Sequence, residues 1–205
     1  RQGKTGIGRA VLGLFLGAAL LAYPAYLGSS ALKLPAINDI TTNPADPPRF
    51  AVLARLRPRG SSDYPGAASA ALQRQAYPAI EPLQVSATPQ VAYEATLALV
   101  QKRKWRVVDA LAPSPARRNG TIEAIAQTML MGFRDDIAIR VSPSGGSAQI
   151  DMRSASRYGQ HDFGANAGRI VSFLSDLDDV ISAMPPERRQ PSQPQRPQRP
   201  QQPRR

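Results

Sequence analysis

Two alternating segments on either side of a glycine-containing turn constrain this fold more than any other feature. Residues 135–142 and 147–153 alternate large apolar with polar side chains, and Pro143-Ser144-Gly145-Gly146 separates them. A period of two is typical of strands that bury one face, so the pattern predicts an antiparallel hairpin. A slip of one residue would move every side chain to the opposite face, which fixes the residues that face the core.

With a four-residue turn, the predicted register also places opposite charges across from each other. The apolar face would hold three cross-strand pairs: Val141 with Ala148, Ile139 with Ile150, and Ile137 with Met152. The other face would pair Arg140 with Gln149, Ala138 with Asp151, and Asp136 with Arg153. Such cross-strand pairs stabilise a sheet.

Helices are predicted before and after this hairpin. Thr88-Pro89 is a typical helix start, and the basic residues 102–104 suit the negative end of that helix. Residues 105–108 and 121–128 read as strands, and residues 163–183 as a helix with Asp162 at its N-terminus. The order predicts an α+β, two-layer domain over residues 89–184, with three or four antiparallel strands and both helices on the apolar face.

Residues 29–88 are rich in Pro, Gly, Ser and Ala and show little periodicity. We expect this segment to wrap around the domain as loop, with short strands within residues 37–42 and 50–56. Residues 185–205 consist almost entirely of Pro, Gln and Arg, and this composition predicts an extended, disordered tail. An alternative is a cationic tether to anionic lipid or to an acidic envelope polymer.

Residues 10–28 form an apolar segment without charge, close to the length that crosses a bilayer. A signal peptide and a buried core helix are the alternatives, but the apolar run is longer than a signal core. Residues 1–9 carry three basic residues, so a transmembrane helix would keep this flank in the cytoplasm and place the domain outside. Gly13 and Gly17 form a G-x-x-x-G pair that allows another helix to approach. Because the chain begins with Arg1, we expect further membrane helices upstream.

The formal charge of +11 is concentrated at the two ends of the chain. Residues 187–205 hold six arginines and one glutamate. A nucleic-acid-binding domain would carry its basic residues on a folded face, so this distribution argues against nucleic acid as a partner. The chain has no cysteine, which excludes disulfides, thiolate metal sites and cysteine nucleophiles.

Several segments resemble a known family. They are residues 38–42 with Pro44, Tyr77-Pro78, and residues 135–141, 152–157 and 162–170. In this order they resemble the bacterial and plastid family called domain of unknown function 1499, over residues 36–183. The anchored form is similar to alphaproteobacterial versions, which implies a bacterial inner membrane protein with its main domain in the periplasm. The resemblance implies no reaction, catalytic residue, cofactor or ligand.

The polar residues offer few arrangements for catalysis. His161 is the only histidine, which excludes a multi-histidine metal site. A triad with a serine would depend on it, but a loop position explains His161 equally simply. Asp135 and Asp136 are neighbours on a strand and point to opposite faces, so they are not expected to chelate one ion.

One polar group at the strand–helix junction carries the ligand hypothesis. Its members are Arg153, Ser154, Ser156, Arg157, Asn166 and Arg169. They could form an anion pocket beside the helix N-terminus, for a carboxylate or a phosphate. Alternatively, they could lock the strand to the helix through ion pairs and bonds to backbone. The first functional hypothesis is a non-enzymatic, partner-binding accessory subunit, and the second is a small-molecule or lipid-binding domain that uses this junction.

Overall fold

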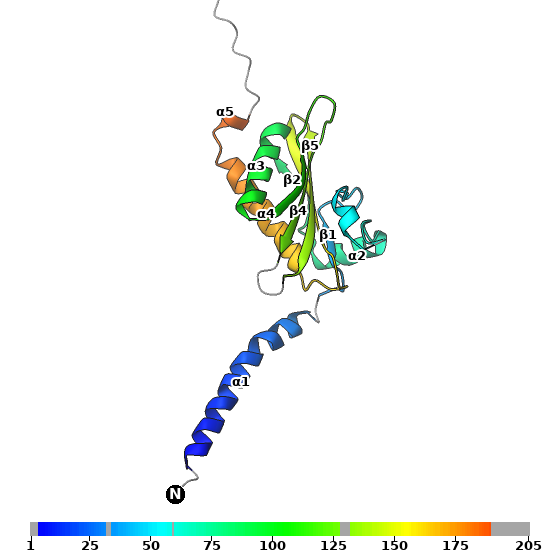
Figure 1. Ribbon diagram of the computed structural model, residues 1–205. Coiled ribbons are helices and arrows are strands. Elements are labelled where there is room, and N and C mark those ends of the chain that lie inside the picture. Colours follow the sequence, from blue (N-terminus) through cyan, green and yellow to red (C-terminus); the bar gives the residue numbers. More distant parts are fainter. Residues whose placement is uncertain (1–3, 32–33, 59, 128–131, 190–205) are drawn as a thin grey trace, which may run out of the picture.

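The computed structural model describes residues 4–31, 34–58, 60–127 and 132–189 (Figure 1). An antiparallel sheet of six strands forms the centre of the domain, in the order β1-β6-β5-β4-β3, with β2 also paired to β6. The strands are β1 (Asp39–Thr41), β2 (Leu83–Val85), β3 (Arg106–Leu111), β4 (Gly120–Gln127), β5 (Arg134–Ser144) and β6 (Ser147–Ser156). The helices are α1 (Lys4–Ala31), α2 (Ala67–Ala76), α3 (Pro89–Lys102), α4 (Ala165–Ser182) and the short α5 (Pro186–Arg189).

The hairpin of β5 and β6 forms, but the predicted register is wrong by two residues. Val141 lies opposite Ile150, Ile139 opposite Met152, and Arg140 opposite Asp151. The turn contains only Gly145 and Gly146, with φ angles of 54° and 87°, and Ser144 pairs with Ser147. Two-residue hairpin turns favour such positive φ angles because they match the twist of the strands. A two-residue shift leaves each side chain on its predicted face, so the face assignment holds. Asp136 and Arg153, however, are not paired.

The α+β class is confirmed, but the sheet has two more strands than the maximum predicted. Both come from the segment expected to wrap the domain: β1 pairs with residues 153–155 of β6, and β2 pairs with residues 148–150. The strand expected within residues 37–42 is therefore confirmed. The one expected within 50–56 is wrong, because Leu53–Leu56 is a 3₁₀ helix, η1. The carboxylate of Glu123 accepts hydrogen bonds from the N–H groups of residues 51–53, which fixes this turn.

Two helices cover one face of the sheet, and a second layer covers the other. The main core packs α3 and α4 against apolar residues of β4, β5 and β6, including Ile122, Ile139 and Ile150. On the opposite face, Phe50 and Leu53 pack against β4, β5 and β6. The predicted two-layer arrangement is therefore wrong, because the structure has a third layer. The residues in contact there are far apart in the sequence and leave no periodic pattern in it.

The two helices that cover the sheet, α3 and α4, begin with the predicted capping residues. The Thr88 hydroxyl accepts a hydrogen bond from the N–H of Val91 at the start of α3. Asp162 accepts from the N–H groups of Gly164 and Asn166 at the start of α4. The sequence also predicts an apolar stripe on α4 that faces the core, made of Ala167, Ile170, Val171, Leu174, Leu177 and Ile181. Val171 differs from this prediction, because it is 52% exposed. Phe173 is buried in the core and stacks on Trp105.

Helix α1 extends away from the domain (Figure 1). Residues Gly6–Tyr26 are long and apolar enough to cross a membrane, and none of this span is buried against the rest of the described chain. A signal sequence would pass the same test of length and composition. At the other end of the chain, Pro186–Arg189 is helical where an extended tail was predicted, and residues 190–205 lie outside the described part.

Candidate functional site

The sheet separates the six predicted junction residues into two groups. Ser154 and Ser156 face α4, where Asn166 and Arg169 meet them. Arg153 and Arg157 lie on the opposite face. Successive residues of a strand point to opposite sides, so the six side chains do not converge on one pocket.

On the helix face, the polar atoms bind one another. Arg169 donates to Asp135 Oδ2 at 2.5 Å and to Ser154 Oγ at 2.9 Å. The amide of Asn166 donates to Ser156 Oγ and to the carbonyl of Asn38, both at 3.0 Å. This network ties the start of α4 to β5, β6 and the segment before β1, which is the arrangement expected of a structural lock.

On the opposite face, buried carboxylates neutralise the two other arginines. Arg153 binds Asp39 through two parallel hydrogen bonds, Nε to Oδ1 at 2.9 Å and Nη2 to Oδ2 at 2.7 Å. Burial raises the pKa of Asp39, while the hydrogen bond and charge of Arg153 lower it. Arg157 donates from Nε to both oxygens of Asp136 at 3.0 Å and from Nη2 to Oδ1 at 2.8 Å, and Arg57 Nη1 donates to Oδ2 at 2.9 Å.

Sequence reasoning missed Asp39 and Arg57. Asp39 lies in one of the segments that carried the family resemblance, but nothing in its spacing indicated a bond to a residue 114 positions away. Arg57 lies in a segment without periodicity, and its guanidinium also donates to the carbonyls of Ser61, Ala155 and Ser156.

The prediction for Asp135 and Asp136 is confirmed for the direction of their side chains, but the predicted partner of Asp136, Arg153, is wrong. Their side chains lie on opposite faces of β5 and bind different arginines. Within the described residues, no group of three His, Asp or Glu side chains is arranged to hold a metal ion.

His161 is bound by the backbone around it. Its Nδ1 accepts from the N–H of Phe163 at 2.9 Å, and its Nε2 lies 3.3 Å from the carbonyl of Leu34. The ring also stacks on Phe163, with centroids 4.6 Å apart. The hydroxyl of Ser154, which a triad would have to direct at His161, donates to Asn166 Oδ1. These contacts give His161 a role in shaping the turn before α4.

A cavity of about 390 Å³ lies beside Arg153. Its lining includes Asp46, Arg49, Asp63 and Tyr64. Burial raises the pKa of Tyr64, and the charge of Asp39 adds to this. The mixture of acidic, basic and phenolic groups would suit a small polar molecule.

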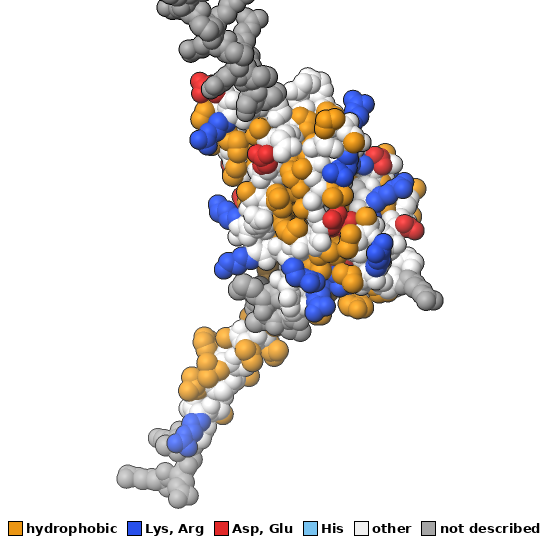
Figure 2. Space-filling model, turned by 45° about the horizontal axis from the view of Figure 1, so that its top comes forward, with side chains coloured by type: hydrophobic (Ala, Val, Ile, Leu, Met, Phe, Trp, Pro, Cys, Tyr) orange, Lys and Arg blue, Asp and Glu red, His pale blue; other side chains and the backbone are white. Residues whose placement is uncertain are grey.

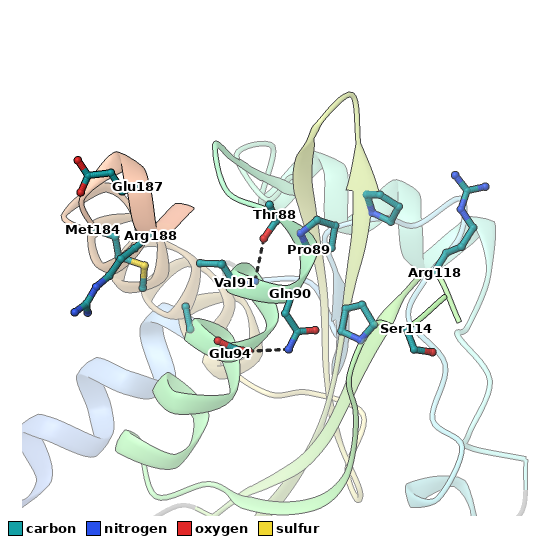
Figure 3. A pocket seen from close by; sticks show the side chains of 13 residues that line it. Thr88, Pro89, Gln90, Val91, Glu94, Ser114, Arg118, Met184, Glu187 and Arg188 are labelled. Atoms are coloured by element: carbon teal, nitrogen blue, oxygen red, sulfur yellow. Dashed lines mark hydrogen bonds between the residues drawn. The ribbon is translucent and has the colours of Figure 1, made fainter. Parts of the chain in front are cut away.

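A groove of about 1060 Å³ lies at the N-terminal end of α3 (Figure 3). The side chains of Thr88, Gln90 and Glu94 line one wall, Ser114 and Arg118 another, and Met184, Glu187 and Arg188 a third. The Thr88 hydroxyl already caps α3, and Gln90 donates to Glu94. None of the predicted junction residues lines this groove.

An apolar groove of about 780 Å³ lies between residues 76–80 and α4. Leu34, Tyr77, Ile80, Ala167 and Val171 contribute to its walls. The hydroxyl of Tyr77 is buried and has no hydrogen-bond partner among the described residues. Burial, followed by the charge of Asp162, raises its pKa. Sequence reasoning missed this groove, because the apolar pattern of α4 placed Val171 in the core.

A family model with the description "Protein of unknown function (DUF1499)" matches residues 39–177. The chain belongs to the DUF1499 family. The matched range holds the buried ion pairs and the junction network of this DUF1499 domain, whereas α1 precedes it. A search of curated protein sequences finds no match.

Several solved structures share low similarity with this DUF1499 chain. The Aha1 dimer from Colwellia psychrerythraea is 13% identical, with a TM-score of 0.33, over 50% of this chain and 94% of that one. Ara h 8.0201 is 8% identical, with a TM-score of 0.30, over 51% and 96%. CalU16 from Micromonospora echinospora is 12% identical, with a TM-score of 0.29, over 50% and 83%.

Proposed function

We propose that this DUF1499 chain is a membrane-anchored domain that binds another membrane protein outside the cytoplasm, as a non-enzymatic accessory subunit. The observation that carries the proposal is α1, whose span Gly6–Tyr26 has the length and composition of a bilayer-crossing helix and is not buried against the domain. A soluble core helix would bury its apolar side chains, and those of α1 have no such partner in the described chain.

The orientation follows from the basic residues before the helix. Residues 1–9 contain Arg1, Lys4 and Arg9, which favour the cytoplasmic side. The domain would then lie in the periplasm of a bacterial cell. Gly13 and Gly17, with open space around both, would allow close packing against a transmembrane helix of the partner. We also propose that the arginine-rich segment 190–205 contacts anionic lipid or an envelope polymer.

The apolar groove is the surface we propose for the partner's contact with the domain. Leu34, at its edge, is three residues beyond the last residue of α1, so the groove lies near the membrane in any orientation of the helix. A groove with apolar walls favours an apolar segment, and a membrane protein exposes such segments close to its bilayer-embedded part.

A small anionic or polar ligand is the second candidate, favoured by the cavity beside Arg153. Each of the arginines Arg153, Arg157 and Arg169 already binds a carboxylate, so an anion would have to compete with Asp39, Asp136 or Asp135. This competition makes partner binding the better supported function.

Photo-crosslinking from two positions on α4 tests the proposal. A photoreactive residue replaces Val171, in the groove, or Val180, which is also exposed and lies outside the groove lining. We expect Val171, and not Val180, to give one adduct of defined mass with a protein that has a transmembrane segment. The same protein should co-purify stoichiometrically in mild detergent, and Val171→Arg should remove it while Val180→Arg retains it.

Equal adducts from both positions, or loss of the partner in both arginine variants, would contradict the groove assignment. Purification with a retained small anion and no protein would favour the ligand-binding candidate.

A further inference from the structure

Three exposed aromatic residues gather at the end of the domain that follows α1. Phe163 is 66%, Tyr158 73% and Phe133 60% exposed. Phe133 precedes β5 and Tyr158 follows β6, and these two strand ends are neighbours because Asp135 pairs with Ser156. Phe163 lies in the turn that leads to α4. Large aromatic rings in contact with water are unfavourable unless another surface covers them.

The backbone holds Phe163 in a strained conformation. Its φ of 54° is in the left-handed region, which bulky L-residues rarely adopt. Two contacts to His161, the backbone hydrogen bond and the ring stacking, maintain this conformation. Strain of this kind is concentrated at functional positions.

Exposed charges at the same end are mostly basic, and the exposed Asp176 of α4 pairs with Arg103 at 2.7 Å. Lys104 lies just before β3, and Arg106 is its first residue. The start of β3 pairs with the last part of β4, and Arg134 begins β5 opposite Gln127 of β4. All three side chains are exposed. Nearby acidic residues Asp135, Asp136 and Asp162 are buried, and each accepts hydrogen bonds from arginines or backbone N–H groups. Figure 2 shows blue side chains predominating over red ones where the domain adjoins α1.

The chain length keeps this end close to α1. Leu34 contacts His161 and lies beside Gly164, so only two residues of the chain separate α1 from a residue that touches the aromatic turn. Between Tyr26 and Leu34 the chain advances by five residues of helix and then by three further residues. The two Cα atoms are therefore at most about 20 Å apart. If Tyr26 lies at the membrane interface, Phe163 is within reach of the lipid headgroups.

We infer that this end of the domain, with Phe163, Tyr158 and Phe133 surrounded by Lys104, Arg106 and Arg134, docks on the surface of an anionic bilayer. Aromatic rings favour the interface between headgroups and acyl chains, and basic side chains are attracted to acidic headgroups. The inference rests on the proposed anchoring by α1. Docking would orient the apolar groove, whose lining includes Phe163, towards segments of a membrane protein at the same depth.

Fluorophores on single cysteines test the inference in the full chain, which has no cysteine of its own. Labels are placed at Gln160 beside Tyr158, at Ala116 in the loop at the opposite end of the sheet, and at Leu16 within α1. The protein is reconstituted in nanodiscs of phosphatidylcholine alone, or of an equal mixture with phosphatidylglycerol. Lipids with a nitroxide on the headgroup quench labels at the membrane surface, and lipids with a nitroxide on the acyl chain quench the label at Leu16, which lies near the centre of the span. We expect quenching at Gln160 only in anionic discs, at Leu16 in both kinds, and at Ala116 in neither.

Charge reversal supplies the matched control. Lys104→Glu, Arg106→Glu and Arg134→Glu together should lower the ratio of docked to undocked protein by at least about 100-fold, since loss of each basic residue removes about a fivefold factor and each glutamate adds repulsion. Arg118→Glu with Arg188→Glu, at the other end, should leave it unchanged. Phe163→Asn, which tolerates the left-handed conformation, should weaken docking without lowering the unfolding midpoint.

The outcomes separate the two proposals. Quenching at Leu16 without quenching at Gln160 would overturn the docking and leave the anchor intact. Absence of quenching at Leu16 would overturn the anchoring itself. Quenching at Gln160 that is equal in both lipids, or that survives the triple reversal, would overturn the electrostatic docking. A label at Gln160 that lipid never quenches, but that a co-purified protein shields from solvent, would identify this end as a protein-binding surface and overturn the docking as well.

Discussion

Asp39 and Arg153 form a deeply buried ion pair, with side chains 4% and 2% exposed. The guanidinium of Arg153 also lies over the ring of Phe50, 4.4 Å from its centroid. A buried pair of this kind contributes little net stability compared with an apolar replacement, but removal of one partner leaves an uncompensated charge. The two possible single removals are not equivalent, because an unpaired carboxylate can become neutral by taking up a proton, whereas an unpaired guanidinium cannot lose one.

Replacement of Asp39 by Asn should therefore be strongly destabilising. We expect a loss of about 3–5 kcal/mol in the free energy of unfolding, because Arg153 stays charged at every accessible pH. Denaturation followed by the fluorescence of Trp105, the only tryptophan, measures it. A loss no larger than that of an exposed substitution, such as Asp63→Asn, would contradict this account.

Removal of Arg153 should instead give a pH-dependent loss. In Arg153→Met the desolvation that raises the pKa of Asp39 remains, and the guanidinium that lowers it is gone. A carboxyl with a raised folded-state pKa makes the fold less stable as pH rises above its unfolded value of about 4. Relative to the double variant Arg153→Met with Asp39→Asn, the single variant should be about 1–3 kcal/mol less stable at pH 7. The difference should vanish near pH 4, and a constant difference across this range would contradict the prediction.

The β5–β6 hairpin shows what periodicity leaves open at the scale of an element. Alternation with period two excludes a shift of one residue, but a shift of two restores each side chain to its face. The turn then decides, because Gly145 and Gly146 both adopt positive φ and close the hairpin with two residues. The shift separates Asp136 from Arg153 and leaves each to bind a partner from a different segment.

Substitution of Gly146 should reveal this turn. No described atom lies within 4 Å of a Cβ placed there, so only the backbone conformation opposes a side chain. Gly146→Val should lower the free energy of unfolding by about 1–2 kcal/mol, and Gly146→Asn by clearly less, since Asn tolerates the left-handed region. Thermal unfolding of the two variants measures the difference. Equal stability of the Val and Asn variants would indicate a turn with ordinary φ angles.

At the scale of the whole molecule, the chain divides into a helix whose apolar side chains are exposed and a domain that buries its own. Helix α1 displays Leu12, Leu14, Phe15 and Leu20 to the surroundings. The domain covers both faces of its sheet and carries the exposed side chains of Phe133, Tyr158 and Phe163, with three exposed basic residues, at the end that follows α1. A bilayer around α1 would remove its apolar surface from water.

Charged residues in the middle of α1 should release the protein from membranes. Leu14→Arg with Leu16→Arg adds two cations near the centre of the span, at a cost of about 2.5–3.5 kcal/mol for each. We expect the native chain in the pellet after alkaline carbonate extraction and the double variant in the supernatant. Leu14→Ala with Leu16→Ala, which keeps the segment apolar, is the control. Native protein in the supernatant would indicate that α1 does not span the bilayer.

The sequence by itself determined which residues of β5 and β6 face the core, where α3 and α4 begin, and that residues 6–26 are apolar enough for a membrane. Each of these depends on residues close together in the chain, where periodicity and capping act. Only the tertiary structure decided the hairpin register, the recruitment of β1 and β2 to the sheet, and the pairing of Arg153 with Asp39. These features join segments that are far apart in sequence, and two-residue shifts or alternative acidic partners satisfy the local patterns equally well.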